Sequence, residues 1–597
     1  MQESRERIPA RLERRVLVKV AGADTALPVA WQPGVEPAAL ASKFRAAHER
    51  HFGFRVESGA ALVVESLELE AVVPGADDAA TPAIPAVTAG RVKPIARRDV
   101  WCADGWRSVP VYDRALLPPG TRFMGPAVIV ESNATTIVEP GWRAEVHESG
   151  TLLLTRIRGG PRREAVGRDA DPIMLEVFNN LFMHVAEEMG IVLEHTAHSV
   201  NIKERLDFSC ALFAADGSLI ANAPHMPVHL GSMGDSVQSI LRSKKLAPGD
   251  AYLLNTPYNG GTHLPDLTVV TPVFDAPGRK LRYFVASRAH HADIGGSTPG
   301  SMPPSSRTID EEGVLFDGVR IVVGSELLEA EVRALLARGP FPARNPDQNI
   351  ADLKAQLAAN ARGALELGRL VERFGIRTIE RYMRHVQHNA AACVRSAIAE
   401  LRDGRFTVEL DGGQRICVRV SIGADRRSAI VDFSGTSAVD AGNFNAPSSI
   451  ARAAVLYVFR TLVRQNIPLN AGCLEPLSIV LPEGCLLDPR YPAAVVAGNV
   501  ETSQCITDAL LAALDACAGA QGTMNNFTFG NAHHQYYETL CGGAGAGPGF
   551  HGASGVHTHM TNSRLTDPEV LEQRYPVRIV RFAIRRGSGG AGRWRGG

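Results

Sequence analysis

Two stretches without hydrophobic periodicity divide this chain, and they limit its possible folds more than any other feature. The first is VPGADDAATPAIPAVTAG at residues 73–90, which is rich in Pro, Ala and Gly. The second is RGGPRREAVGRDA at residues 158–170, which is charged and contains glycine. Neither has the period of a helix or a strand, so both are expected to be loops or linkers. A chain of 597 residues divided in this way is predicted to be multidomain, because one hydrophobic core does not grow to that size.

The parts before the second stretch are predicted to be small. Residues 15–70 contain strand-like runs around PAALASKFRAAHERHF, whose apolar positions recur at helical spacing, so we expect a small α+β unit. Residues 98–157 contain short β runs separated by PPG and EPG turns, which favours a compact β unit.

Residues 171–597 are predicted to form a large mixed α+β body. It opens with an Asp-Pro helix start, and the FSCALFAADGSLIA run that follows is typical of a hairpin with Asp216-Gly217 at the turn. Residues 346–402 have the strongest helical pattern and are expected to form two antiparallel helices. The predicted fold class is therefore α+β and multidomain.

Charge and cysteine content exclude several classes of protein. Lys+Arg and Asp+Glu both number 63, so there is no basic excess for a nucleic-acid backbone. There is no run of about 18 apolar residues and no signal-peptide pattern, so we expect no membrane insertion and a cytoplasmic location. Nine scattered cysteines without a C-x-x-C pair argue against a disulfide framework or a thiolate zinc site, although one cysteine could still be a nucleophile.

Two clusters of His and Asp carry the clearest chemical signal. The first, GGTHLPDLTVV, contains His263 and Asp266; the second, SRAHHADIGG, contains His290, His291 and Asp293. Imidazole nitrogen with carboxylate oxygen is a ligand set for a divalent metal, and the adjacent glycines would let the backbone approach a bound group closely. The third ligand could be either histidine of the pair, with Asp293 as a further ligand or as the acceptor that orients an imidazole. The alternative is that both clusters are hydrogen-bonded loops.

Further polar residues stand in apolar surroundings. Arg205 and Asp207 precede a hydrophobic strand, His229 follows in APHMPVHLGSM, and His559 lies in SGVHTHMTNSRL. Each of these could equally be a solvated loop residue. Arg585 could bind a carboxylate or phosphate, although surface arginines are more often free of such a role, and the glycine-rich segments near it lack a P-loop ending.

Several long motifs resemble the hydantoinase B / 5-oxoprolinase family. They include DFSCALFAADGSLIANAPHMPVHLGSM, GGTHLPDLTVVTPVF, HHADIGGSTPGSMPPSS, QGTMNNFTFG and SGVHTHMTNSRLTDPEVLEQRYPV. The stretch GPAVIVESNATTIVEPGWRAEV resembles the C-terminal end of the hydantoinase A subunit. The resemblance implies a hydantoinase A C-terminal region at 1–157, a linker at 158–170 and a hydantoinase B domain at 171–597 that is incomplete at its C-terminus.

The resemblance also implies a reaction and a site. The reaction is ATP-dependent hydrolysis of a cyclic amide, 5-oxo-L-proline to L-glutamate. Related carboxylases hold a metal that falls on His263, Asp266 and His290, with His291 as the alternative third ligand. Among the other polar residues we expect catalytic roles for Asp207, His229, Asp293 and His559, and substrate binding by Arg205, Asn525, Asn526 and Arg585. The ligand types suit Mn, Zn or Fe, and Mg less well.

Cofactor and partner expectations follow from the same resemblance. The chain is expected to begin inside the A-type region, so ATP would be bound by a missing or separate hydantoinase A-type ATPase part. Exposed apolar surface where that part would dock suggests an oligomer. The alternatives are an N-methylhydantoinase, an acetone or acetophenone carboxylase-type subunit, and an inactive fragment or assembly subunit.

Overall fold

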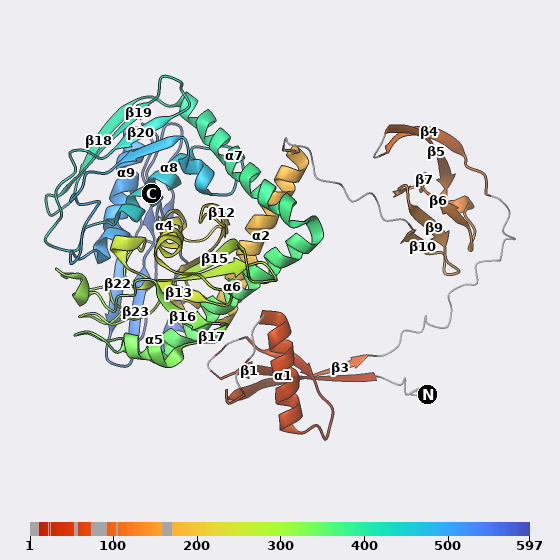
Figure 1. Ribbon diagram of the computed structural model, residues 1–597, viewed down its shortest axis with the longest axis horizontal. Coiled ribbons are helices and arrows are strands. Elements are labelled where there is room, and N and C mark those ends of the chain that lie inside the picture. The colour runs from red at the N-terminus through yellow and green to blue at the C-terminus, as the bar shows by residue number, and fades with distance from the viewer. Residues whose placement is uncertain are drawn as a thin grey trace, which may run out of the picture. The chain divides into compact units, whose positions relative to one another are not determined.

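A computed structural model describes residues 11–21, 23, 25–52, 56, 58–72, 92–102, 105–157 and 170–597 (Figure 1). These residues form two compact units. One comprises the described residues within Met1–Arg15 and Leu67–Asp171, and the other those within Val16–Ser66 and Pro172–Gly597. The predicted linker 158–170 lies outside the described residues except for its last position. The predicted domain boundaries stay a prediction.

The N-terminal segment is the expected small α+β arrangement. A three-stranded sheet in the order β2-β1-β3 is formed by β1 (Arg11–Val20), β2 (Leu27–Ala30) and β3 (Leu62–Val72), with α1 (Pro37–Phe52) between β2 and β3 in sequence. Val16 and Val18 of β1 pack with Phe44 and Phe52 of α1. These residues lie two apart in the strand and eight apart in the helix, so each spacing keeps its pair on one face.

The next segment is all β, as predicted, apart from the short helix η2 (Arg114–Leu116). One sheet has the order β4-β5-β7-β8 and a second has the order β10-β9-β6. The strands are β4 (Ala96–Cys102), β5 (Gly105–Asp113), β6 (Arg122–Met124), β7 (Ala127–Val130), β8 (Thr135–Val138), β9 (Trp142–Val146) and β10 (Leu152–Arg156). Ala127, Ile129, Ala144 and Val146 alternate into a shared core.

The large body is built on a seven-stranded antiparallel sheet in the order β12-β11-β15-β14-β13-β16-β17. Its strands are β11 (Phe208–Ala214), β12 (Leu219–Asn222), β13 (Ala251–Leu254), β14 (Asp266–Phe274), β15 (Leu281–His290), β16 (Val319–Val323) and β17 (Glu326–Leu327). The predicted hairpin is confirmed as β11 and β12, and Gly217 at its turn has a φ of 76°.

Helices cover both faces of this sheet. On one face α2 (Pro172–Thr196) packs on β11 and β12, and α6 (Pro346–Phe374) packs on β14 and β15. On the other face α4 (Pro227–Ser243) packs on β11, β14 and β15. Val269 therefore joins the core under α6, whereas Val270 joins the core under α4. Burial on both faces explains why these strands are almost continuously apolar and do not alternate with polar residues.

A second layer packs against α4. It contains the four-stranded sheet β18-β19-β20-β21 together with α7 (Ile376–Glu400), α8 (Ser448–Thr461) and α9 (Ser503–Ala513), around the largest hydrophobic core of the body. Its strands are β18 (Gly404–Glu409), β19 (Arg415–Ile422), β20 (Ala429–Asp432) and β21 (Leu477–Val480). The two helices expected in residues 346–402 are present as α6 and α7, but α6 packs chiefly along α2 and less extensively with α7. The sequence could not show this, since α2 lies more than 150 residues earlier.

The remaining elements are short. They are α3 (Val200–Lys203), η3 (Pro257–Asn259), η4 (Ile309–Glu311), α5 (Glu329–Leu336), η5 (Ala471–Leu474), η6 (Gly498–Thr502), β22 (Asn526–Gly530), β23 (Gln535–Thr539), β24 (Gly542–Gly543), β25 (Ser554–Val556) and α10 (Pro568–Arg574). Among the described residues, no helix is both long enough and apolar enough to span a membrane. The predicted fold class, mixed α+β and multidomain, is confirmed.

Candidate metal centre

The pairing of β14 with β15 brings two of the predicted ligands together. Asp266 is the first residue of β14 and His290 is the last residue of β15, and the antiparallel register places them directly opposite each other. The next pairs on the same face are Thr268 with Arg288 and Val270 with Ala286. His263 lies in the turn before β14, where its carbonyl accepts a hydrogen bond from the Asp266 N–H. Asp266 and His290, which are 24 positions apart in the sequence, are thus neighbours because a hairpin joins their strands.

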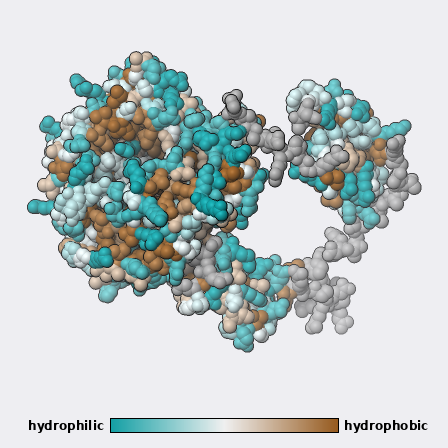
Figure 2. Space-filling model, viewed as in Figure 1, coloured by the Kyte–Doolittle hydropathy of each residue, from teal (hydrophilic) through white to brown (hydrophobic). Residues whose placement is uncertain are grey.

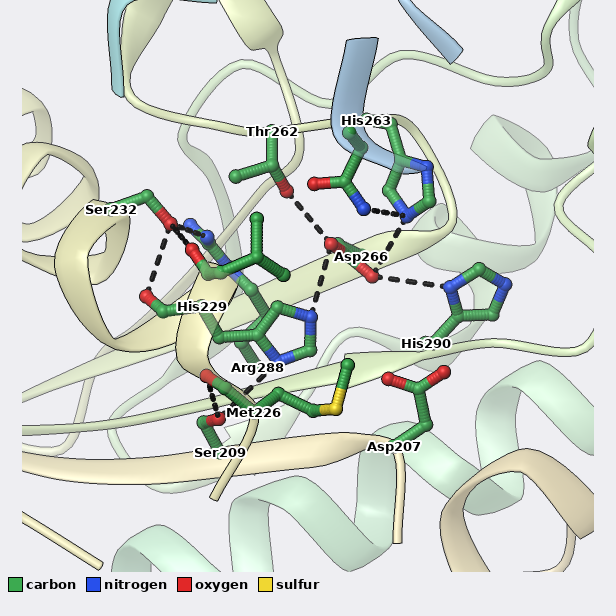
Figure 3. A network of polar contacts seen from close by, with 12 residues as sticks. Asp207, Ser209, Met226, His229, Ser232, Thr262, His263, Asp266, Arg288 and His290 are labelled. Atoms are coloured by element: carbon green, nitrogen blue, oxygen red, sulfur yellow. Dashed lines mark hydrogen bonds and ion pairs between the residues drawn. The ribbon is translucent and has the colours of Figure 1, made fainter. Parts of the chain in front are cut away.

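Asp266 is the centre of a buried polar cluster (Figure 3). Its Oδ1 lies 3.1 Å from His263 Nε2 and 3.3 Å from His290 Nδ1. Its Oδ2 lies 3.1 Å from His229 Nε2 of α4 and accepts a hydrogen bond from Thr262 at 2.8 Å. Burial raises the pKa of this carboxyl, but the charges of His263 and His229 outweigh burial and hold the pKa well below its usual range. Asp266 is therefore a carboxylate at neutral pH.

The donor set fits a divalent metal. Among the residues that the structure describes, His263, Asp266 and His290 form the one group of three whose ligand atoms all lie within 4.8 Å of one another. Asp266 Oδ1, which lies between His263 Nε2 and His290 Nδ1, is buried without a hydrogen-bond partner in the described part of the chain. Burial also lowers the pKa of His290, which favours the neutral imidazole that binds metals. Two imidazoles and one carboxylate leave coordination positions open, as a catalytic site needs.

Arg288 lies two residues before His290 in β15, on the same face of the sheet, and its positive charge is close to Asp266. It is fully buried, and its guanidinium donates to Thr268, Ser232, Ser236 and the carbonyl of Gly260. Burial lowers the pKa of Arg288 to about 10, and Asp266 opposes this decrease. A buried positive charge near Asp266 further stabilises the carboxylate.

His291 faces the opposite side of the sheet from His290. Its Nε2 lies 3.1 Å from Gln356 Oε1, and its Nδ1 lies 3.1 Å from Asn349 Nδ2, both on α6. Successive residues of a strand point to opposite faces, so His290 faces the α4 side and His291 the α6 side. Of the two histidines left open by the sequence, the structure places His290 beside Asp266.

Asp293 anchors the loop after β15. Its carboxylate accepts hydrogen bonds from the N–H groups of Gly295, Gly300 and Arg344, and it pairs with the Arg344 guanidinium at 2.8 Å. The catalytic role expected for Asp293 stays a prediction, since these contacts place it in a loop and not beside Asp266.

Arg205 and Asp207 lie behind His290. The Arg205 guanidinium is fully buried, pairs with Glu538 at 2.8 Å and lies 4.7 Å from the ring centroid of Tyr537. The Tyr537 ring in turn stacks on His290, with centroids 4.4 Å apart and planes 11° apart. The Asp207 carbonyl accepts the His290 N–H. These contacts favour a positioning role, and the substrate-binding and catalytic roles expected for Arg205 and Asp207 stay predictions.

The other predicted residues are more dispersed. Asn526 accepts a hydrogen bond from the Tyr537 hydroxyl at 2.9 Å, so it joins the group behind His290. Asn525, with a φ of 50°, donates to the Leu540 carbonyl. His559 pairs with Asp508 at 2.9 Å, and Arg585 is exposed in the C-terminal segment. Their expected roles stay predictions.

The paired glycines have a different use from the one expected. A Cβ on Gly260 would lie 2.6 Å from the backbone of Asp235, and one on Gly296 would lie 2.9 Å from the backbone of Glu312. Close approach is therefore required, but it is to the protein's own backbone. These glycines let the loops around the cluster pack tightly.

The structure favours packing over nucleophilic chemistry for most cysteines. All nine are free. Burial raises the pKa of Cys210, Cys393, Cys473, Cys485, Cys505, Cys517 and Cys541. A raised pKa reduces the thiolate that a nucleophile requires.

Sequence reasoning missed Asn499, whose Nδ2 lies 3.2 Å from His263 Nε2. It also missed Tyr537 and Arg288. Asn499 stands in VVAGNVETSQ, where a run of polar residues follows an apolar one, and that run was the available signal. An amide does not belong to the His/Asp pattern by which the cluster was found.

The fold and this cluster define a class: mixed α+β proteins with a buried His/Asp ligand set at the end of a covered antiparallel sheet. Residues 171–597 match the family model described as hydantoinase B/oxoprolinase, and residues 47–155 match the one described as hydantoinase/oxoprolinase C-terminal domain. The chain belongs to the hydantoinase B/oxoprolinase family, which confirms the resemblance.

Relatives extend the match over nearly the whole chain. It is 42% identical to 5-oxoprolinase 1 of Arabidopsis thaliana over 96% of its own residues and 47% of that protein. The chain therefore spans about half the length of the first curated relatives it matches.

Two solved structures share the fold. The ATP-dependent caprolactamase from Pseudomonas jessenii gives a TM-score of 0.64 at 24% identity, covering 72% of this chain and 77% of that one. A nucleotide-free acetone carboxylase gives a TM-score of 0.64 at 17% identity, covering 72% and 61%.

Proposed function

We propose that this chain carries the metal centre of an enzyme that hydrolyses a cyclic amide, 5-oxo-L-proline, to L-glutamate with cleavage of ATP. The observation that carries the proposal is the buried Asp266 carboxylate with three histidines around it, His229, His263 and His290. The name 5-oxoprolinase, which the Arabidopsis relative bears, supports the choice of substrate. In the reaction the ring C–N bond breaks, water supplies the new oxygen on the carbonyl carbon, and the nitrogen gains a proton.

His263, Asp266 and His290 would hold the metal, and Mn, Zn or Fe suit these ligands better than Mg. A bound metal of this kind polarises a carbonyl oxygen or lowers the pKa of water. His229 orients Asp266, because its Nε2 faces Oδ2 while its Nδ1 lies 3.3 Å from the Ser209 hydroxyl. Arg288 keeps the same carboxylate charged from behind.

We assign ATP cleavage to a hydantoinase A-type part supplied by another segment or chain. The family resemblance supports this assignment, because residues 171–597 match the hydantoinase B model and residues 47–155 only the C-terminal domain of the oxoprolinase type. A cytoplasmic location and self-association remain predictions from the sequence.

The test combines elemental analysis with an assay. Purified wild type, His290→Asn and His291→Asn are compared for bound Mn, Zn and Fe, and for 5-oxoproline turnover with ATP and a hydantoinase A-type partner. We expect one equivalent of metal in wild type and in His291→Asn, and loss of metal and turnover in His290→Asn. The two positions are adjacent and both buried, so the second variant controls for the cost of altering a buried histidine.

Other outcomes separate the alternatives. Equal metal content in all three proteins would contradict the assigned ligands. Metal without amide hydrolysis, but with carboxylation of a ketone when bicarbonate and ATP are added, would favour the carboxylase-type subunit. Absence of both metal and turnover would favour an assembly subunit.

A further inference from the structure

Asn499 is brought to the cluster by a π-helix. The helix η6 (Gly498–Thr502) leads directly into α9, and π-helical turns inside α-helices are frequent at functional sites. The side chain of Asn499 is 3% exposed, and its Nδ2 lies 3.2 Å from His263 Nε2. A residue 236 positions after His263 thus faces the ring nitrogen that lies nearest Asp266.

The backbone of this turn is fixed on both sides of Asn499. The N–H groups of Ala497 and Gly498 both donate to the Asn443 carbonyl, and the Asn499 carbonyl accepts the Ser503 hydroxyl at 2.6 Å. Two residues further on, Glu501 accepts hydrogen bonds from Thr523 and Asn526. With the backbone held in this way, a half-turn about the last torsion of the Asn499 side chain changes which end of the amide faces His263.

The observed choice leaves polar atoms unsatisfied. With Nδ2 toward His263, Asn499 Oδ1 is buried and has no hydrogen-bond partner among the described residues. The same Nε2 lies 3.1 Å from the Asp266 carboxylate, which can only accept, so this ring nitrogen faces both a donor and an acceptor and satisfies at most one of them, while the buried Nδ1 is without a partner within the same described part of the chain. The accepting lone pair on Nε2 is also the one that a metal would use. A carboxamide presents oxygen or nitrogen by a half-turn, and its neighbours decide which.

We propose that Asn499 is a further protein group of the metal centre and that its Oδ1 faces the bound ion. The proposal rests on the metal site assigned above. An amide N–H pointing at a cation is repelled, whereas the amide oxygen is a good ligand or acceptor for water bound to the ion. The π-turn places this amide beside His263 without using a further His or carboxylate, so the total charge of the ligand set is unchanged.

Three substitutions of Asn499 distinguish a role for its amide oxygen at the metal from a role for its N–H as a hydrogen-bond donor to His263. Asn499→Asp keeps the shape and the oxygen but removes the N–H, whereas Asn499→Leu and Asn499→Ala remove both. Metal-free full-length protein is titrated with Co²⁺ alone, by visible absorption, and with Zn²⁺ by calorimetry. Asn179→Leu is the matched control, since Asn179 is a buried asparagine of α2 whose Oδ1 also lacks a partner in the described residues.

We expect Asn499→Leu and Asn499→Ala to bind both ions at least about 10-fold more weakly, the loss typical when a group next to a metal is removed. Asn499→Asp is expected to bind within about threefold of wild type or more tightly, with an altered Co²⁺ spectrum. Asn179→Leu is expected to match wild type.

An Asp variant as weak as the Leu and Ala variants would overturn the proposal, because the donated N–H would then be what matters. Equal affinity in all of the Asn499 variants would also overturn it. If wild type binds neither ion, the metal site itself fails, and that result is distinct from a failure of Asn499 alone.

Discussion

At the scale of single residues, the sequence predicted which residue types form the buried cluster better than it predicted their arrangement. His263 and Asp266 were found because they stand three apart beside glycines, and the structure places their side chains 3.1 Å apart. The choice between His290, the last residue of β15, and His291, which follows it, depends on which side of the sheet each faces, and strand register is not visible in one sequence. Asn499 was missed, because its amide lies outside the His/Asp pattern and nothing in the sequence signals a π-turn.

His225 gives a pH-dependent prediction at this scale. Its Nδ1 accepts the Cys210 N–H at 3.0 Å, and Phe208 packs against its ring. Burial, aided by His229, lowers the pKa of His225 to about 3. The folded pKa lies below the unfolded value of 6.5, so the unfolded state takes up the proton first as the pH falls, and stability is lost below about pH 6.5.

Between pH 7 and pH 5 we expect His225 to account for a loss of about 2 kcal/mol in unfolding free energy, at about 1.4 kcal/mol per pH unit below 6.5. In His225→Asn the amide oxygen can accept the same N–H and does not titrate, so this part of the slope should disappear. Urea unfolding of metal-free wild type and variant at both pH values measures it. Parallel pH profiles would show that His225 is not the source.

At the scale of elements, hydrophobic periodicity identified helices and strands that have one buried face. It was less informative for strands that are buried on both faces. β9 and α1 were recognisable from their own residues. The strands β11, β14 and β15 are apolar on both faces, so their residue pattern does not indicate that α4 and α6 lie on opposite sides of them. Contacts such as that of α6 with α2 depend on packing between distant segments, which local patterns do not encode.

The loop before β14 carries an element-scale prediction. Gly260, which ends η3, has a φ of 96°, and a Cβ there would lie 2.6 Å from the Asp235 backbone. We expect Gly260→Ala to lower the unfolding free energy by about 3 kcal/mol, from left-handed strain together with overpacking.

Gly234→Ala is the control for that substitution, because Gly234 lies within α4 and a Cβ there would meet nothing within 4 Å. We expect it to raise stability by about 0.5–1 kcal/mol, since alanine favours the helix interior over glycine. Denaturant unfolding of both variants gives the comparison. If Gly260→Ala leaves the unfolding free energy unchanged, the loop can move away from α4.

At the scale of the whole molecule, the sequence predicted the mixed α+β class. The run of small units before a large body stays a prediction, since Val16–Ser66 and Pro172–Gly597 form one compact unit in the described residues. Figure 2 shows apolar side chains gathered at several places on the visible face of the body, and Phe406, Ile430 and Tyr491 are among its exposed hydrophobic residues. The expected association remains a prediction that a concentration series in analytical ultracentrifugation would check.

Metal binding should be visible in the stability of the large unit. An ion that binds only the folded state, at 100 times its Kd, raises the unfolding free energy by about 2.7 kcal/mol. We therefore expect calorimetry of wild type to show a higher unfolding temperature with Zn²⁺ than with a chelator, and no such difference in His263→Ala. A shift of equal size in the variant would place the ion elsewhere.

The direct pairing of Asp266 with His290 has a consequence for how such chains diverge. The loop that joins β14 to β15 lies at the far end of the hairpin, so insertions there lengthen the interval between the two residues without moving either side chain. Inserting one residue within β15 would instead exchange the faces of all positions beyond it, and the imidazole at position 290 would leave the cluster. Searches for distant members of the family should therefore align the ends of these strands and leave the number of residues between them free.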